Sequence, residues 1–201
     1  MPHNSYEVIS LYFDDSDLSM FYDHAHGVQQ RYKYRLRAYR DSQGNLQEKM
    51  FFEKKIKNDQ RGSKERIAIE DHFGKNSLRQ HGDLNVLLGV GVRLHEMSNL
   101  SMFDLRKVIP RAFVSYHRKR YASANAAAEI NIDTRLTATG VSKLNSALRT
   151  VRANFLVMEE KWHDPPTTDR RLIKGLNSKG YPSAFSKYMW AMQSTQPKTI
   201  I

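Results

Sequence analysis

The sequence predicts an α+β protein in which antiparallel β-strands curve into a tunnel or barrel, with helices packed on the outside. Two observations lead to this prediction. Basic residues recur at every second position in several segments separated by turn-forming residues, which is the period of strands with two different faces. Between and after these segments, leucine, valine and methionine occur at mixed spacing that favours helices.

The expected elements follow one another along a single domain at residues 1–196, with a tail at residues 197–201. Residues 41–45 (DSQGN) are typical of a turn and join two of the strands as a hairpin. We expect strands at residues 6–13, 31–40, 50–57, 64–70, 111–121, 129–136 and 153–162, and helices at residues 76–92, 99–108, 168–177 and 188–193.

The composition excludes several kinds of site and indicates the kind of partner. The 201 residues contain no cysteine, which excludes a disulfide, a thiolate nucleophile and a cysteine metal site. No apolar run approaches the roughly 18 residues that span a bilayer, and the first residues lack a secretory pattern, so we expect a cytoplasmic protein. A net charge of +11 points to nucleic acid, an anionic membrane surface or phosphate-rich molecules as partner.

The basic residues form rows on the expected strands. Side chains alternate between the two faces of a strand, so each row lies on one face. Such a row also fits the solvated outer face of an ordinary sheet. However, two like charges about 4 Å apart repel by roughly 4 kcal/mol at an effective dielectric of 20, so rows facing each other across a closed interior need a bound polyanion. The rows comprise Arg31, Lys33, Arg35 and Arg37; Glu53, Lys55 and Lys57; Tyr116, Arg118 and Arg120; and Glu159 and Lys161.

Glu159 is the candidate metal ligand. A carboxylate among cations can simply balance their charge. Among phosphates it has a second use, because a hard divalent ion bridges carboxylate and phosphate oxygens. Glu53 is the weaker candidate for the same role.

Seven short segments, in order along the chain, resemble motifs of one known family. This is the VTC domain, the catalytic polyphosphate polymerase domain of the vacuolar transporter chaperone complex and its bacterial relatives, which belongs with the CYTH-like triphosphate tunnel metalloenzymes. Each motif alone is weak, but their shared order is fairly specific. The segments are residues 10–14 (SLYFD), 33–39 (KYRLRAY), 52–55 (FEKK), 63–66 (SKER), 114–118 (VSYHR), 157–161 (VMEEK) and 185–188 (FSKY).

The resemblance implies a function and a set of site residues. The implied reaction transfers the terminal phosphoryl group of ATP to a growing polyphosphate chain, with Mn²⁺ or Mg²⁺ held by Glu159. Arg35, Arg37, Arg118 and Lys187 are the implied catalytic residues. The implied phosphate-binding residues are Lys33, Arg35, Arg37, Lys55, Lys64, Tyr116, Arg118, Lys161, Ser186 and Lys187.

Two features depart from the family pattern and bear on catalysis more than on phosphate binding. The chain starts at the strand that follows the family's basic and acidic "RxExK" strand, so we expect that wall of the tunnel to be missing or to come from elsewhere. Glu129 stands where the family has an arginine, which reverses the charge there.

Three alternatives to a polymerase stay open. The same site with a water nucleophile is a triphosphatase, and a member that has lost activity is a binding module for polyphosphate or inositol phosphates. Nucleic-acid binding is less favoured and no DNA is expected, because Tyr32 and Tyr34 lie on the strand face opposite the arginines.

Overall fold

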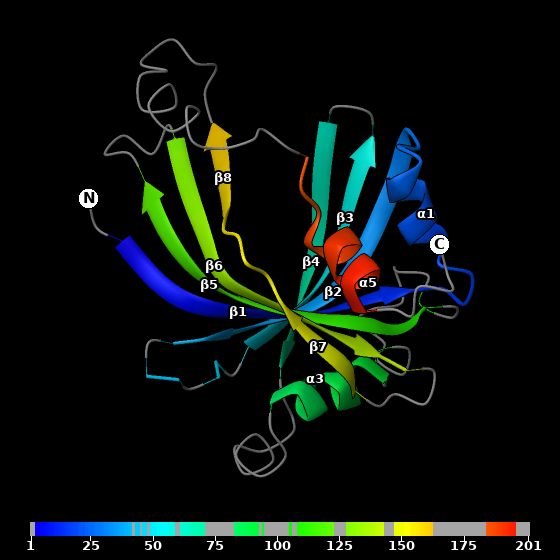
Figure 1. The fold of residues 1–201 in the computed structure, drawn as a ribbon, viewed down its shortest axis with the longest axis horizontal. Helices are drawn as coiled ribbons and strands as arrows, with labels where there is room; N and C mark the ends of the chain where they lie inside the picture. The colour runs from blue at the N-terminus through cyan, green and yellow to red at the C-terminus, as the bar shows by residue number, and fades with distance from the viewer. Residues whose placement is uncertain are drawn as a thin grey trace.

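The computed structural model describes residues 3–41, 43–44, 46–47, 49–58, 61–70, 83–92, 94, 105, 108–122, 128–142, 147–162 and 184–195. These residues form one eight-stranded sheet with three helices (Figure 1). The elements in chain order are β1 (His3–Asp14), α1 (Ser19–Ala25), β2 (Gln30–Arg40), β3 (Lys49–Asn58), β4 (Arg61–Glu70), α3 (Asp83–Val92), β5 (Ile109–Ala122), β6 (Ala128–Val141), β7 (Ala147–Arg152), β8 (Val157–Trp162) and α5 (Lys187–Thr195).

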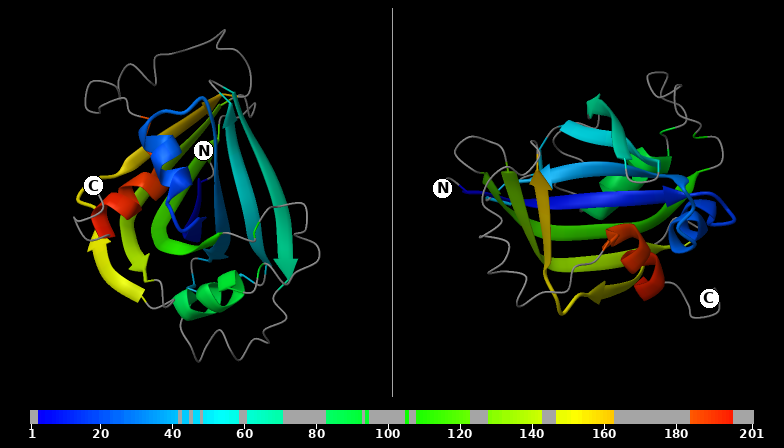
Figure 2. Two further views of the ribbon diagram at one scale, coloured as in Figure 1. Left: turned by 90° about the vertical axis from the view of Figure 1, so that its right-hand side faces the viewer. Right: turned by 90° about the horizontal axis from the view of Figure 1, so that it is seen from above.

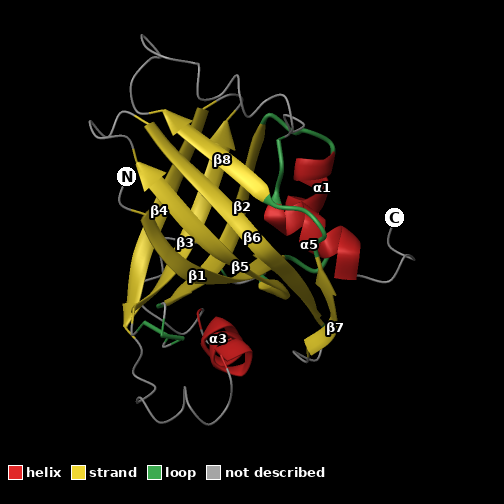
Figure 3. Ribbon diagram, turned by 60° about the vertical axis from the view of Figure 1, so that its left-hand side comes forward, coloured by secondary structure: helices red, strands yellow, loops and turns green. Residues whose placement is uncertain are grey.

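The sheet is antiparallel and strongly curved, with the strand order β4-β3-β2-β1-β5-β6-β7 (Figure 2). β6 is long enough to pair with β8 along its first half and with β7 along its second half (Figure 3). The expected closed tunnel or barrel is wrong for the described strands. Closure requires hydrogen bonding between the two outermost strands, and within the described part of the chain β4 pairs with neither β7 nor β8.

Each face of the sheet carries its own apolar cluster because the strands alternate. Ile9, Leu11 and Phe13 of β1 are buried on the face covered by α3. Val8 and Tyr12 are buried on the opposite face, where α1 and α5 pack at one end. The expectation that helices pack on the outside therefore holds for α3 but not for α5, and α1 contributes to both clusters.

The contact between α3 and β1 is close enough to require a glycine. A Cβ atom on Gly91 would lie 2.7 Å from Leu11 Cδ2 and 3.1 Å from Phe13 Cζ. Such distances are far below ordinary van der Waals contact, so a side chain here would force Leu11, Phe13 or the helix itself to shift.

The strands expected from the sequence are present with bounds that differ by a few residues, and two of them need correction. The expected strand at 153–162 begins only at Val157 as β8, and β7 precedes it without having been predicted. The expected strand at 129–136 continues to Val141 through an irregularity where Arg135 has a φ of 54°. The hairpin of β2 and β3 is confirmed.

The expected helices are confirmed only in part. The prediction for 76–92 is confirmed over α3, and that for 188–193 over α5. The expected helix at 168–177, most of that at 99–108 and the tail at 197–201 lie outside the described residues. None of the helices that the structure describes is long and apolar enough to cross a bilayer.

α1 was not predicted. Asp14, at the end of β1, accepts hydrogen bonds from the backbone N–H of Met20 (3.0 Å) and Phe21 (2.9 Å), and so caps the helix. Its carboxylate also accepts a hydrogen bond from the hydroxyl of Tyr188. Asp14 therefore ties β1, α1 and α5 together at one end of the sheet.

Candidate functional site

One face of the sheet collects the basic rows. Residues directly paired across strands point to the same side of a sheet. Arg35 pairs with Tyr12 on one side and Glu53 on the other, and Arg118 pairs with Tyr6 and Asp133. The same register brings every predicted strand residue of the site to this face, which we call the concave face: Lys33, Arg35, Arg37, Lys55, Lys64, Tyr116, Arg118, Glu159 and Lys161.

The first half of the concave face is built on β2, β3 and β4 around a fully buried carboxylate. Glu53 lies 2.5 Å from Arg35 Nε, 3.8 Å from Arg37 Nε, 3.4 Å from Arg66 Nε and 3.9 Å from Lys64 Nζ. Burial alone would raise the pKa of Glu53, but these cations lower it. We call the charged residues of this half the β2–β4 wall: Arg31, Lys33, Arg35, Arg37, Glu53, Lys55, Lys57, Lys64 and Arg66.

The second half is built on β5, β6 and β8, and an aspartate is its centre. Arg118 donates from Nε and Nη2 to the two oxygens of buried Asp133, at 2.7 and 2.8 Å. Lys187 of α5 lies 2.7 Å from the same carboxylate, and Arg118 Nη2 lies 3.4 Å from Glu159. Lys187 is also 4.7 Å from the centroid of the Tyr116 ring, a cation–π distance.

A third carboxylate, Glu129, joins two further cations at the end of this half. It lies 2.6 Å from Arg120 Nη2 and 3.1 Å from Lys161 Nζ, and it accepts a hydrogen bond from the Asn131 side chain at 2.6 Å. Burial would raise the pKa of Glu129, but these three donors lower it to about 2. We call Arg118, Arg120, Glu129, Asn131, Asp133, Glu159 and Lys161 the β5–β8 wall.

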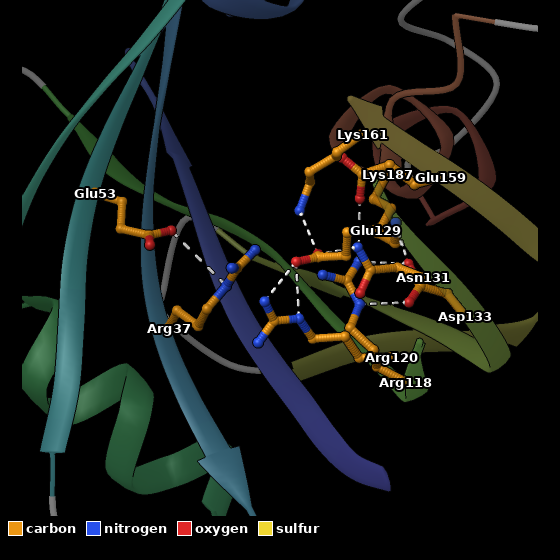
Figure 4. Close-up of polar contacts among 10 residues, drawn as sticks. All are labelled: Arg37, Glu53, Arg118, Arg120, Glu129, Asn131, Asp133, Glu159, Lys161 and Lys187. Carbon is orange, nitrogen blue, oxygen red and sulfur yellow. Dashed lines mark hydrogen bonds and ion pairs between the residues drawn. The ribbon is translucent and has the colours of Figure 1, made fainter. Parts of the chain in front are cut away.

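The two walls face each other (Figure 4). Arg37 and Glu53 come from one side, and the β5–β8 wall with Lys187 comes from the other. Their fields overlap: burial and Arg35 lower the pKa of Lys55, while Glu159 of the opposite wall raises it. Near α5, Lys33 Nζ donates a hydrogen bond to Ser186 Oγ at 3.1 Å. This contact places the two predicted residues Ser186 and Lys187, at the start of α5, beside the β2–β4 wall.

The cations of the concave face change the pKa of buried Tyr12, which lies between the two walls. Tyr12 is 3% exposed and stacks on Tyr188 with ring centroids 5.3 Å apart. Burial would raise the pKa of Tyr12, but Arg35, Lys33 and other cations lower it to about 8. The pKa of Lys33 is likewise lowered to about 8, chiefly by burial and despite the opposing effect of Tyr12. The arrangement favours negative charge above these residues.

A family model for the VTC domain matches residues 2–196. The chain belongs to the VTC domain family. These are domains of the polyphosphate polymerase type. No curated protein matches the chain.

The VTC family implies a divalent cation, and the residues beside Glu159 fit one. The Glu159 side chain is 42% exposed, so its carboxylate is accessible from the concave face. Asn131, its partner across the β6–β8 ladder, is buried, and its Oδ1 atom has no hydrogen-bond partner among the described residues. Carboxylate and amide oxygens suit Mg²⁺ and Mn²⁺. Within the described ranges, however, no group of three or more His, Cys, Asp or Glu residues could hold a metal by itself.

Sequence reasoning missed Asp133, Arg66 and Tyr12, which organise this VTC domain. Asp133 follows Asn131 and Glu129 at every second position of β6, so strand alternation alone places it with the arginines of β5. Arg66 follows Lys64 in the same way on β4. Tyr12 lies within the SLYFD motif, but its position among four cations depends on strand pairing that the sequence does not specify.

Proposed function

We propose that the concave face binds the phosphate chains of ATP and polyphosphate, and that the domain transfers the terminal phosphoryl group of ATP to polyphosphate. The observation that carries the proposal is the convergence of cationic rows from six elements on one face. The β2–β4 wall has eight cations around one carboxylate, which leaves a surplus that a linear polyanion would neutralise.

The cationic residues would divide the work according to their chemistry. Arg35, Arg37 and Arg118 present planar forks that match phosphate oxygens in pairs, whereas Lys33, Lys55, Lys64 and Lys187 act as point charges. The Tyr116 hydroxyl and Ser186 would add neutral hydrogen bonds. Arg118 and Lys187 are already fixed by Asp133, so they would meet the phosphates without first being ordered.

The reaction needs positioning and charge neutralisation more than covalent chemistry by the protein. A terminal oxygen of the polyphosphate chain would form a bond to the γ-phosphorus of ATP, the bond from that phosphorus to the β–γ bridging oxygen would break, and ADP would leave. Arg35 and Arg37 would neutralise the charge that collects on the transferring group and on ADP. A divalent ion, held by Glu159 with the help of Asn131 Oδ1, would neutralise further phosphate charge.

A second candidate is a VTC domain that binds polyphosphate or inositol phosphates without turnover. Two observations favour it. Among the described strands β4 does not pair with β8, so these strands do not enclose a phosphate chain on all sides. Each of its four carboxylates lies within ion-pair distance of a cation, including Glu159, whose partner Arg118 competes with a metal. A triphosphatase, with water as acceptor, is the third outcome to test.

Incubation with ATP and Mn²⁺ separates these functions. ADP with polyphosphate indicates a polymerase, ADP with free phosphate a triphosphatase, and binding of tripolyphosphate by calorimetry without ADP a binding module. Arg37→Ala and Glu159→Ala should each reduce turnover at least tenfold, whereas Lys54→Ala, which changes the opposite face of β3, should not. Polymer formation at the normal rate by both site variants would refute the assignment of the site.

A further inference from the structure

The two walls of the concave face differ in net charge. On the β2–β4 wall, eight cations are opposed by one carboxylate, that of Glu53. On the β5–β8 wall together with Lys187, four cations are opposed by three carboxylates. A phosphate chain is therefore attracted mainly by the β2–β4 wall.

Glu129 is the carboxylate that neutralises the outer end of the β5–β8 wall. In the sheet Glu129 pairs with Lys161 of β8 on one side and with Ala122 of β5 on the other, and Ala122 lies two residues after Arg120. The side chains of Arg120 and Lys161 are 49% and 41% exposed, whereas that of Glu129 is 10% exposed. Both cations are thus open to solvent from above, while their charge is already opposed by a carboxylate buried beneath them.

This cluster lies where a longer phosphate chain would continue. Arg35 pairs with Tyr12 of β1, and Arg120 pairs with Asn4 at the opposite end of the same strand. Eight residues along a strand span about 26 Å at roughly 3.3 Å per residue. A chain that filled the centre of the concave face and extended in this direction would next reach Arg120 and Lys161.

We propose that Glu129 occupies with its own carboxylate an anion subsite formed by Arg120 and Lys161, and thereby confines bound polyphosphate to the rest of the concave face. The inference rests on the proposed function, because it concerns how far the same phosphate chain extends. Its consequence is that a long chain gains little affinity over a short one from this end of the face.

The test compares the affinities of tripolyphosphate and of long-chain polyphosphate by calorimetry, for the unaltered chain, Glu129→Gln and Glu7→Gln. Glu7 forms a similar ion pair with Arg40 (2.9 Å) on the opposite sheet face, so its variant adds the same charge away from the site. Glu129→Gln should tighten binding of the long chain about tenfold, as expected for one freed charge-assisted contact, and that of tripolyphosphate less than threefold. Glu7→Gln should change both by less than twofold.

Arg120→Met keeps the proposal testable if Glu129→Gln does not fold. In the presence of Glu129 it should weaken long-chain binding by less than twofold, whereas in the Glu129→Gln background it should abolish the tenfold gain. A tenfold loss from Arg120→Met alone would overturn the inference, because Arg120 would already bind phosphate. Equal gains for Glu129→Gln and Glu7→Gln would also overturn it. If the unaltered chain binds tripolyphosphate but either of these two outcomes occurs, the inference about Glu129 fails and the proposed function stands. If the unaltered chain binds no tripolyphosphate, the proposed function and the inference both fail.

Discussion

Replacement of Glu53 by glutamine tests whether the cations of the β2–β4 wall are held in place by one buried carboxylate. The change removes a negative charge that lies within 4 Å of four cations and keeps the shape of the side chain. The four cations would then repel one another with nothing between them except the amide.

The expected loss of stability follows from the exposure of each partner. Lys64 and Arg66 are 47% and 33% exposed, so solvent screens their pairs and each contributes at most about 1 kcal/mol. Arg35 and Arg37 are only 16% and 10% exposed, and breaking a buried pair typically costs about 3–5 kcal/mol. We therefore expect Glu53→Gln to lower the free energy of unfolding by about 3–5 kcal/mol.

Urea unfolding at low ionic strength measures this loss, with Glu7→Gln as the control. Glu7 and Arg40 are 20% and 27% exposed, so that variant should lose no more than about 1 kcal/mol. Tripolyphosphate at 100 times its dissociation constant should stabilise the unaltered chain by about 2.7 kcal/mol. It should stabilise Glu53→Gln by more, because the anion then replaces the missing carboxylate. If Glu53→Gln loses no more than Glu7→Gln does, the reasoning about this wall is wrong.

Two further predictions concern the packing of α3 and the field above β1. Gly91→Ala should destabilise the fold by about 1–3 kcal/mol because its Cβ meets Leu11. At Gly89 an added Cβ has nothing within 4 Å, so Gly89→Ala should leave stability unchanged or raise it by up to about 1 kcal/mol. Equal unfolding midpoints for the two variants would contradict this prediction. Tyr12 should ionise near pH 8, which is detected as the phenolate absorbance that Tyr12→Phe removes. Its contribution to stability should grow between about pH 8 and 10, because the Tyr12 hydroxyl of the unfolded chain stays protonated in that range. Tripolyphosphate should raise this pKa, and a titration that tripolyphosphate leaves unchanged would argue against binding over Tyr12.

The strand rows could be predicted because alternation is a local property of the chain. Arg35 and Arg37 on one face of β2, with Tyr34 and Leu36 on the other, follow from the period of a strand. Which strands would meet, apart from the one hairpin, was not predictable from alternation. Closure of the sheet was expected from the basic rows and from the resemblance, and it is not present among the described strands.

The elements that the sequence did not predict depend on contacts or backbone features that a short stretch of sequence does not reveal. The residue before α1, Leu18, makes no side-chain cap, and the cap comes instead from Asp14 at the end of the preceding strand. The expected strand ended at Leu136, whereas β6 continues to Val141 past an irregularity at Arg135 that alternation along the sequence does not show. β7 has only six residues, and its Thr150 and Arg152 are exposed, so it lacks a clear apolar row.

The most direct test of the central claim compares two adjacent lysines of β3 that lie on opposite faces. Lys55 pairs with Lys33 on the concave face, whereas Lys54 lies on the other face over the rings of Tyr32 and Tyr34. Calorimetry with tripolyphosphate should show binding weakened about tenfold by Lys55→Met, since one charge-assisted contact is lost, and by less than twofold by Lys54→Met. Equal effects of the two variants would contradict the claim that phosphate chains bind on the concave face.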